Sequence, residues 1–395
     1  MVSGLTVRER PVYLWAAVAC FIARYIFLDL NKLYALRYGS DVGTFLQSLL
    51  NFAHSGSTFN WPEGQPHLAV HDSWALLVFA PIVAWFPRPE TLIVIQVMAI
   101  AVAAVPLYLF ARGCGLALLP AQLIGIAYLI SPSAQGFAYM DFSENVLVPL
   151  LAFSLALAAQ RKSLLATLVL AQLLMGVKED QIWFLAWFGV AGALWYDRRL
   201  GLAVAALALV NGAVYYGIVD LLGHRPIRPV YGLHVLWWRQ DLAFLLEVLA
   251  PFAFAPLVLG WRLLLALPLL AEITLNAGWP YPMARAGTHY SVPLVTLIAI
   301  GAAAAIASRP AVAWYAVVCS FVMALFFNVT VLHIGRHLFA PDTADYRTAR
   351  QIARSGLPYT YTRNQEGAFV IASPNVNVRL LQVAHFHAKP AWNTQ

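Results

Sequence analysis

Long apolar stretches alternate with very short basic turns along this chain, and this alternation limits what it can fold into. Each apolar stretch approaches the ~20 residues that a helix needs to cross a bilayer. Of the 395 residues, 61% are hydrophobic and only 11% are charged, a balance that a soluble core does not absorb. Backbone groups in lipid must bond within their own segment, and the alternating strands of a barrel are absent from the sequence. We therefore predict an all-α polytopic membrane protein.

We expect about eleven membrane spans, several of them short. They lie near 11–30, 90–112, 116–132, 144–160, 163–177, 180–197, 200–220, 241–260, 263–276, 289–307 and 310–332. The positive-inside rule places the N-terminus in the cytoplasm and the C-terminus outside. The inner turns then carry many basic residues and only Glu9 and Asp197 as acids; the basic residues are Arg8, Arg10, Arg112, Arg161, Lys162, Arg198, Arg199, Arg262 and Arg309.

The segment 72–86 decides this topology, because it is apolar but short and contains Pro81. If it crossed the membrane, every later turn would change sides, and the basic turns would face outward. We therefore expect 72–86 to lie in or dip into the outer interface. Residues 31–89 become one long external loop with short amphipathic helices, and such loops are usually functional or disordered.

With this topology, all ten histidines and all acids other than the two in the inner turns lie in the outer half or outside. Any polar chemistry is therefore expected on that side. The basic residues are scattered, so no nucleic-acid partner is expected. The chain has no GxxxxGK[ST] or GxGxxG nucleotide motif and no GxSxG motif. Its three cysteines show neither metal spacing nor a disulfide framework.

Four outer sites carry the candidate chemistry, and each has a structural alternative. Asp41 stands between glycines and could approach a substrate, or it could only begin the helix Val42 to Ala53. His71 and Asp72 precede the interfacial segment; His71 could bond a phosphate or a carboxylate, and Asp72 could cap a helix.

The other two sites border spans. Asp141 and Glu144 share a short outer turn, and a helix dipole alone would favour Glu144 at a helix start. The run Lys178-Glu179-Asp180 lies between two apolar stretches. It could mark the water surface, or it could line a cavity with a lysine for an anionic headgroup and acids that orient it or hold a cation. His289 and Tyr290, at the start of the tenth span, are weaker candidates.

The tail beyond residue 333 is expected to cap the outer face, with a helix at 343–355 and strands at 368–372 and 376–383. This divides the chain into a membrane module, 1–335, and a small external C-terminal segment, 336–395. The histidine pairs of the tail lack a third ligand, so we assign no metal site.

The order of these motifs resembles an uncharacterised family of prokaryotic polytopic membrane proteins. That family is itself similar to the GT-C membrane glycosyltransferases, which include the protein mannosyltransferases and the aminoarabinose transferases. The resemblance covers roughly 11–335 and rests on Asp41-Val42-Gly43-Thr44-Phe45, His71-Asp72 before Ala80-Pro81, Asp141-Phe142, Lys178-Glu179-Asp180 and His289-Tyr290.

The resemblance implies a GT-C-like bundle in the plasma membrane that takes a polyprenyl-phosphate sugar on the outer face and transfers it to an unknown acceptor. Asp41 would be the catalytic base or would orient the acceptor, and Asp141 and Glu144 would be the acids of the second loop. Lys178 and Arg88 would bind the donor phosphate. Such a transfer needs a carboxylate base and cationic groups, or a divalent cation, at the leaving phosphate.

One departure affects this interpretation. The family often has histidine after its Asp-Phe pair, whereas this chain has Ser143, which is compatible with altered specificity or lost catalysis. Two alternatives remain open from the sequence. One is a lipid or solute transporter or flippase, although no clear internal repeat is visible. The other is a non-catalytic subunit of a membrane complex.

Overall fold

The computed structural model describes residues 10–34, 38, 41–60, 63–222, 238–274, 287–327, 360–363, 369–373 and 376–379. Most of these residues are helical, as expected. The first helices are α1 (Val12–Tyr34), α2 (Asp41–Ser55), η1 (His67–Ala69), η2 (Trp74–Phe79), α3 (Ala80–Trp85), α4 (Pro89–Val102), α5 (Ala104–Gly113), α6 (Leu118–Ile130), α7 (Pro132–Tyr139), η3 (Glu144–Leu147) and α8 (Val148–Gln160).

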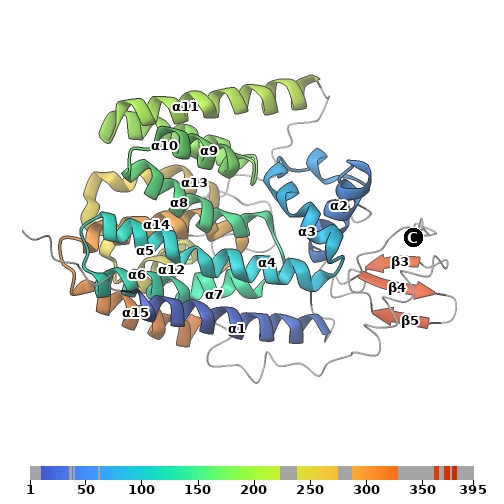
Figure 1. The fold of residues 1–395 in the computed structure, drawn as a ribbon, viewed down its shortest axis with the longest axis horizontal. Helices are drawn as coiled ribbons and strands as arrows, with labels where there is room; N and C mark the ends of the chain where they lie inside the picture. The colour runs from blue at the N-terminus through green and yellow to red at the C-terminus, as the bar shows by residue number, and fades with distance from the viewer. Residues whose placement is uncertain are drawn as a thin grey trace, which may run out of the picture.

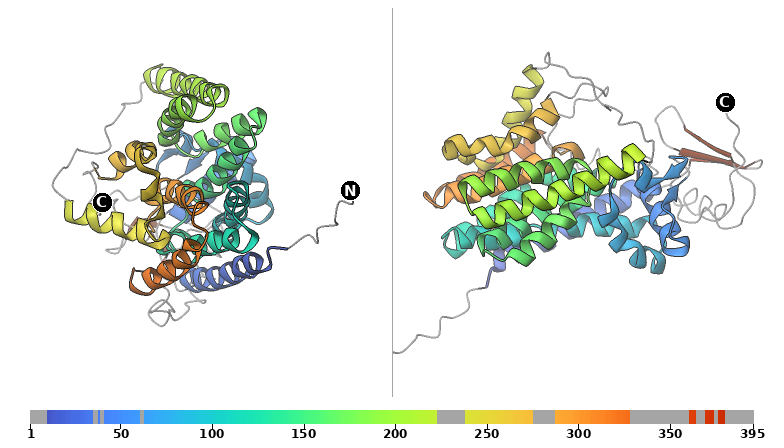
Figure 2. Two further views of the ribbon diagram at one scale, coloured as in Figure 1. Left: turned by 90° about the vertical axis from the view of Figure 1, so that its left-hand side faces the viewer. Right: turned by 90° about the horizontal axis from the view of Figure 1, so that it is seen from above.

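The later helices are α9 (Leu164–Met175), α10 (Asp180–Trp195), α11 (Arg198–Gly212), η4 (Ala213–Leu222), α12 (Trp238–Leu249), η5 (Ala250–Phe252), η6 (Ala255–Ala266), α13 (Leu267–Thr274), η7 (His289–Ser291), α14 (Val292–Ile306) and α15 (Val312–Phe327). Most of the long helices lie side by side along one axis, and α2 and α3 cover one end of the bundle (Figures 1 and 2).

Small residues allow the closest helix packing in the bundle, between α10 and α11. A Cβ atom on Gly201 would overlap the backbone at Ala193, and one on Gly189 would lie 2.5 Å from the backbone nitrogen of Ala205. Each helix thus presents a glycine and an alanine four residues apart. Small residues at this spacing let two backbones approach, which is a common way to join helices in lipid.

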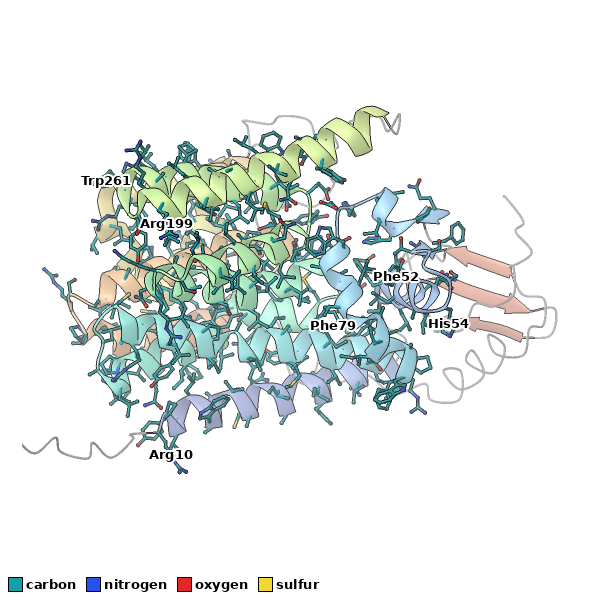
Figure 3. All side chains as sticks on the ribbon, turned by 45° about the horizontal axis from the view of Figure 1, so that its top comes forward. Arg10, Phe52, His54, Phe79, Arg199 and Trp261 are labelled. Carbon is teal, nitrogen blue, oxygen red and sulfur yellow. The ribbon has the colours of Figure 1, made fainter. Side chains whose placement is uncertain are left out.

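The two ends of the bundle differ in charge. We call them the α2 end, where α2 and α3 lie, and the basic end, where Arg10, Arg199 and Trp261 lie (Figure 3). Phe52, His54 and Phe79 lie at the α2 end. The turn from α8 to α9 and the turn from α10 to α11 both lie at the basic end. Because successive helices run in opposite directions, these basic turns lie at the same end of the bundle, as the sequence predicts.

Five helical segments among the described residues are long and apolar enough to cross a membrane, judged by length and composition. They are Val12–Tyr34, Pro89–Gly113, Arg198–Gly217, Ala255–Thr274 and His289–Ile306. Shorter apolar helices include Leu118–Ile130, Glu144–Gln160, Leu164–Met175 and Val312–Phe326. The number of eleven crossings and the GT-C arrangement stay predictions.

The segment from Trp74 to Trp85, formed by η2 and α3, is also one of the shorter apolar helices. At ~1.5–2.0 Å per residue it reaches roughly 20 Å, less than the ~30 Å hydrocarbon core. Its length therefore agrees with an interfacial segment. Ser73 holds the position directly before η2 and makes no side-chain capping hydrogen bond, so Asp72 does not occupy the cap position of this helix.

The single helix expected over 241–260 is also wrong. The chain leaves α12 through the one-turn η5 and then passes through Ala253 and Phe254, both with left-handed backbone angles. Pro251 and Pro256 flank this break, and proline removes a backbone donor that a continuous helix would use. The apolar segment that follows, η6 and α13, changes direction at Gly260, where φ is 59°.

The tail contains a three-stranded antiparallel sheet in the order β3 (Thr360–Arg363), β4 (Phe369–Ser373) and β5 (Val376–Arg379). Tyr361 pairs with Ile371, and Ile371 pairs with Val378. The two expected tail strands are thus present as β4 and β5, with 380–383 outside the described residues. The expected helix at 343–355 also lies outside them. A second, two-stranded sheet joins β1 (Phe59–Asn60) to β2 (Gln65–Pro66).

Candidate functional site

Residues from four separate segments meet at the α2 end, and we call them the polar cluster. These segments precede η2, begin η3, connect α9 to α10, and form η7. The cluster consists of His71, Asp72, Glu144, Lys178, Glu179, Asp180, His289 and Tyr290. Eight of the eleven residues that the sequence singles out thus lie close together.

An ion pair forms the centre of the polar cluster. Lys178 Nζ lies 3.6 Å from Glu144 Oε1, and both side chains are almost fully buried. Ser143, the residue before η3, donates its hydroxyl hydrogen to Glu144 Oε2 at 3.2 Å. Removing one partner of a buried pair leaves an uncompensated charge, which costs about 3–5 kcal/mol. The run 178–180 therefore does more than mark the water surface.

A second polar contact joins the interfacial loop to the α9–α10 turn. Glu179 Oε1 lies 2.9 Å from His71 Nδ1, and Glu179 Oε2 accepts the backbone N–H of Asp72 at 3.1 Å. Burial lowers the pKa of His71, but the hydrogen bond and charge of Glu179 outweigh it, so the pKa is raised. Burial raises the pKa of Glu179, but His71 and Lys178 outweigh it, so that pKa is lowered. Both shifts favour the charged pair.

Close packing fixes this loop against the turn. The backbone N–H of Ala75 donates to the carbonyl of Gly176 at 2.8 Å. A Cβ atom on Gly176 would overlap the Trp74 indole, so only glycine leaves room for the ring. Trp74 is thereby held beside Gly176, two residues before Lys178 begins the charged run.

η7 brings His289 and Tyr290 to the same place. Asn145 donates its side-chain N–H to the carbonyl of His289 at 3.1 Å. Lys178 Nζ lies 5.7 Å from the centre of the Tyr290 ring, on its face. A Cβ atom on Gly136 of α7 would overlap the backbone of Gly287, whose φ is +85°. Two glycines therefore permit the close approach that positions η7.

Acids outnumber cations in the polar cluster. Asp180 accepts the side-chain N–H of Gln181 at 2.9 Å and interacts electrostatically with Lys178 and Glu179. Glu272 of α13 interacts with the same three charged residues. Sequence reasoning did not connect Glu272 to this site, because nothing in the spacing shows where α13 packs.

The sequence also missed a neighbouring group, the Lys32 cluster, at the end of α1. Lys32 Nζ donates to the carbonyl of Tyr139 at 2.9 Å and lies 3.3 Å from Asp141 Oδ1. Asp29, which is fully buried, interacts electrostatically with Lys32 and Asp141. Burial and the charge of Asp29 raise the pKa of Tyr139 to about 12. Asp141 is therefore held by Lys32, a residue counted among the loop residues after the first span.

Three predicted site residues lie outside the polar cluster. Asp41 is the first residue of α2, half-buried, and interacts electrostatically with Tyr290. Asp141 likewise reaches the polar cluster through its electrostatic interaction with His289. Arg88 is exposed at the start of α4, and nothing places its side chain within the cluster. The predicted pairing of Arg88 with Lys178 on one phosphate therefore lacks support in the geometry.

The residues that the structure describes contain no group of three or more His, Cys, Asp or Glu side chains placed to hold a metal ion. Mg²⁺ is commonly held by one or two carboxylates and the phosphate groups of a ligand.

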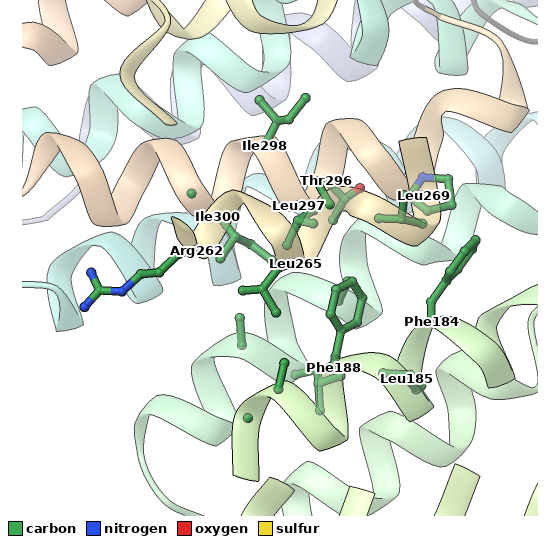
Figure 4. Close-up of a pocket in the computed structure, with 18 of the residues that line it drawn as sticks. Phe184, Leu185, Phe188, Arg262, Leu265, Leu269, Thr296, Leu297, Ile298 and Ile300 are labelled. Atoms are coloured by element: carbon green, nitrogen blue, oxygen red, sulfur yellow. The ribbon is translucent and has the colours of Figure 1, made fainter. Parts of the chain in front are cut away.

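An apolar cavity of about 730 Å³ lies beside the polar cluster, between α8, α10, α11, η6 and α14. Gln181, which bonds Asp180, lines one part of it, and Arg262 lines another. Leu265, Phe188 and Leu297 also line it, and the Arg262 side chain points away from them at one edge (Figure 4).

The helices and the buried charges at their ends together define a helical membrane protein with a polar site at one end. Residues 32–221 match the model of a protein family described as "Predicted membrane protein (DUF2079)". The match covers α2 to α11 and thus the polar cluster, except for η7. No curated protein and no solved structure matches the chain. The chain is therefore similar to a family of membrane proteins, which agrees with its five candidate spans.

Proposed function

We propose that this protein is a membrane glycosyltransferase that transfers a sugar from a polyprenyl-phosphate donor to a hydroxyl acceptor. The observation that carries the proposal is the convergence of Asp41, the Lys178–Glu144 pair and Tyr290 at one end of the bundle. A lipid-linked donor also agrees with the absence of a nucleotide-binding motif from the sequence.

Asp41 is the best candidate for the general base. Asp141, the acid of the second loop, is held by Lys32 at 3.3 Å, which suits a positioning role better than proton transfer. Asp41 begins α2 and lies within electrostatic range of Tyr290, which in turn lies beside Lys178. A carboxylate there could accept the acceptor's hydroxyl proton while the sugar leaves its phosphate.

Lys178 would stabilise the leaving phosphate, but its charge is already opposed by Glu144 and the neighbouring acids. A divalent cation shared between these carboxylates and the phosphate would supply the missing positive charge. The polyprenyl-phosphate product would then leave through the lipid phase.

The test is donor consumption by protein reconstituted in liposomes, because this readout does not require the acceptor to be known. Polyprenyl-phosphate hexoses and pentoses would be supplied with a crude membrane acceptor fraction, and released polyprenyl phosphate would be measured. We expect Asp41→Asn to lower turnover about 100-fold or more. The matched control, Asp241→Asn in the first turn of α12, should stay within about twofold of the unchanged protein, since no ion pair or hydrogen bond ties that carboxylate to the cluster.

Two results would refute the assigned chemistry. One is full activity in Asp41→Asn, and the other is no consumption of any donor by well-folded protein with Mg²⁺ or Mn²⁺ present. The apolar cavity favours a second candidate, a lipid transporter. That function predicts transbilayer movement of a fluorescent lipid in the same liposomes without donor consumption.

A further inference from the structure

The cavity described above has chemically different ends. Along α10 it extends from Gln181 to Tyr196, a rise of about 22 Å at ~1.5 Å per residue. Its wall between these ends is almost entirely aliphatic and aromatic, with Phe184, Phe188 and Leu265 among the lining residues. An apolar space of this length within a membrane protein suits a hydrocarbon chain.

The end near Tyr196 is basic. Arg262 lines the cavity there and is exposed, with its guanidinium 5.6 Å from the Trp261 ring. Arg198 and Arg199 are exposed at the adjoining start of α11. Asp197 offsets only part of this charge, since it is one carboxylate among four basic residues and lies 3.8 Å from Lys162.

Aromatic residues mark this end as the level of lipid headgroups. Trp195 and Trp261 pack edge to face with ring centres 4.5 Å apart, and both are exposed. Tyr196, also exposed, donates its hydroxyl hydrogen to the carbonyl of Ala159 at 3.2 Å. Trp and Tyr gather at membrane interfaces because their rings combine an apolar body with a polar edge.

At the opposite end, carboxylates outnumber cations. Gln181 lines the cavity there and donates its side-chain N–H to Asp180, and Glu179 and Glu272 interact with the same carboxylate. A lipid phosphate is therefore favoured at Arg262 and disfavoured beside Gln181. We propose that the cavity holds one chain of an anionic phospholipid whose phosphate lies at Arg262. This site is separate from the sugar-transfer site and does not depend on that function.

The test is lipid retention by the full-length protein, measured by native mass spectrometry in detergent with phosphatidylglycerol or phosphatidylcholine of identical chains. We expect phosphatidylglycerol to be retained about tenfold more strongly. Arg262→Gln should remove this preference. Arg309→Gln is the matched control, because Arg309 is an exposed arginine that does not line the cavity, and it should leave the preference unchanged.

A second pair of variants tests the chain-binding part. Ala156→Trp in α8, or Ala304→Trp in α14, places a large ring in the cavity and should reduce retention of both lipids about tenfold in protein that still elutes as a single species. Equal retention of the two lipids, or unchanged retention in Arg262→Gln and in both tryptophan variants, would overturn the proposal. Loss of the preference in Lys178→Gln but not in Arg262→Gln would also overturn it, by placing the headgroup at the acidic end.

Discussion

Lys178 carries one positive charge among several carboxylates, and this balance decides what the polar cluster can bind. Glu144 is 3.6 Å away, and Glu179, Asp180 and Glu272 interact with it electrostatically. A site in which carboxylates outnumber cations does not attract a phosphate by itself. It suits a phosphate that arrives with a divalent cation, or an acceptor whose hydroxyl hydrogen is donated to a carboxylate.

The ion pair between His71 and Glu179 predicts a pH dependence of stability. Because the pKa of His71 is raised, its contribution to the stability of the folded protein is complete below the pKa of the unfolded state, about 6.5. This contribution is lost as the pH rises through the pKa of the folded state. Because the pKa of Glu179 is lowered, its contribution is complete above the unfolded value of about 4.3 and is lost as the pH falls through the folded value.

We therefore expect His71→Gln, which removes the charge, to destabilise the protein most between about pH 4.5 and 6.5, by about 1 kcal/mol after solvent screening. Thermal unfolding in detergent across this pH range would measure it. His54→Gln is the control, since His54 is exposed and its Nδ1 lies 2.7 Å from the backbone carbonyl oxygen of Leu50 in its own helix. A destabilisation that increased toward pH 9 would contradict the pairing.

Sequence alone identifies most of this site because its charges interrupt apolar runs or border them. His71, Glu144 and Lys178 are visible for that reason. Which charges pair is set by packing, so the links from Lys178 to Glu144 and from Lys32 to Asp141 were not predictable. Asp29 escaped notice because it falls within the first span, where its neighbours in space are unknown.

At the scale of elements, glycines allow the segments that carry the site to touch. Gly176 accommodates Trp74, and Gly136 accommodates Gly287, so η2 and η7 both dock closely. The sequence predicts where α2 and the interfacial segment begin, because their amphipathic patterns are local. It does not predict the break at Ala253 and Phe254, because an apolar run that contains prolines can form either one kinked span or two separate helices.

Gly176→Ala tests the docking of η2. The added methyl group overlaps the Trp74 ring, so we expect a loss of about 1–3 kcal/mol in stability and a weaker His71–Glu179 contact. Thermal unfolding would measure the loss, and limited proteolysis would show increased cleavage near residue 71. In Gly212→Ala the new methyl would lie 3.6 Å from Ile182 Cγ2, an ordinary contact, so this control should be neutral or slightly stabilising. Equal behaviour of the two variants would exclude tight docking.

At the scale of the whole molecule, the bundle has the α2 end, which carries the polar cluster, and the basic end. The apolar cavity lies between helices that connect them. The grouping of the basic turns follows from the alternation of helix direction and was predictable from the positive-inside pattern. The one uncertain element in that pattern was 72–86, which forms only a short helical segment beside α2. The polar cluster and Asp41 form a single chamber on one side of the membrane only if this segment does not cross the membrane.

Cysteine labelling with a membrane-impermeant maleimide tests this chamber most directly. All variants are made in a background where Cys20, Cys114 and Cys319 are replaced by serine. Ser57→Cys precedes the segment 72–86 in the chain and Met140→Cys follows it, and both report the α2 end. Ser163→Cys and Ser308→Cys report the basic end. We expect Ser57→Cys and Met140→Cys to be labelled in intact cells, and the other two only in inverted vesicles. Labelling of Ser57→Cys and Met140→Cys from opposite faces would contradict the chamber.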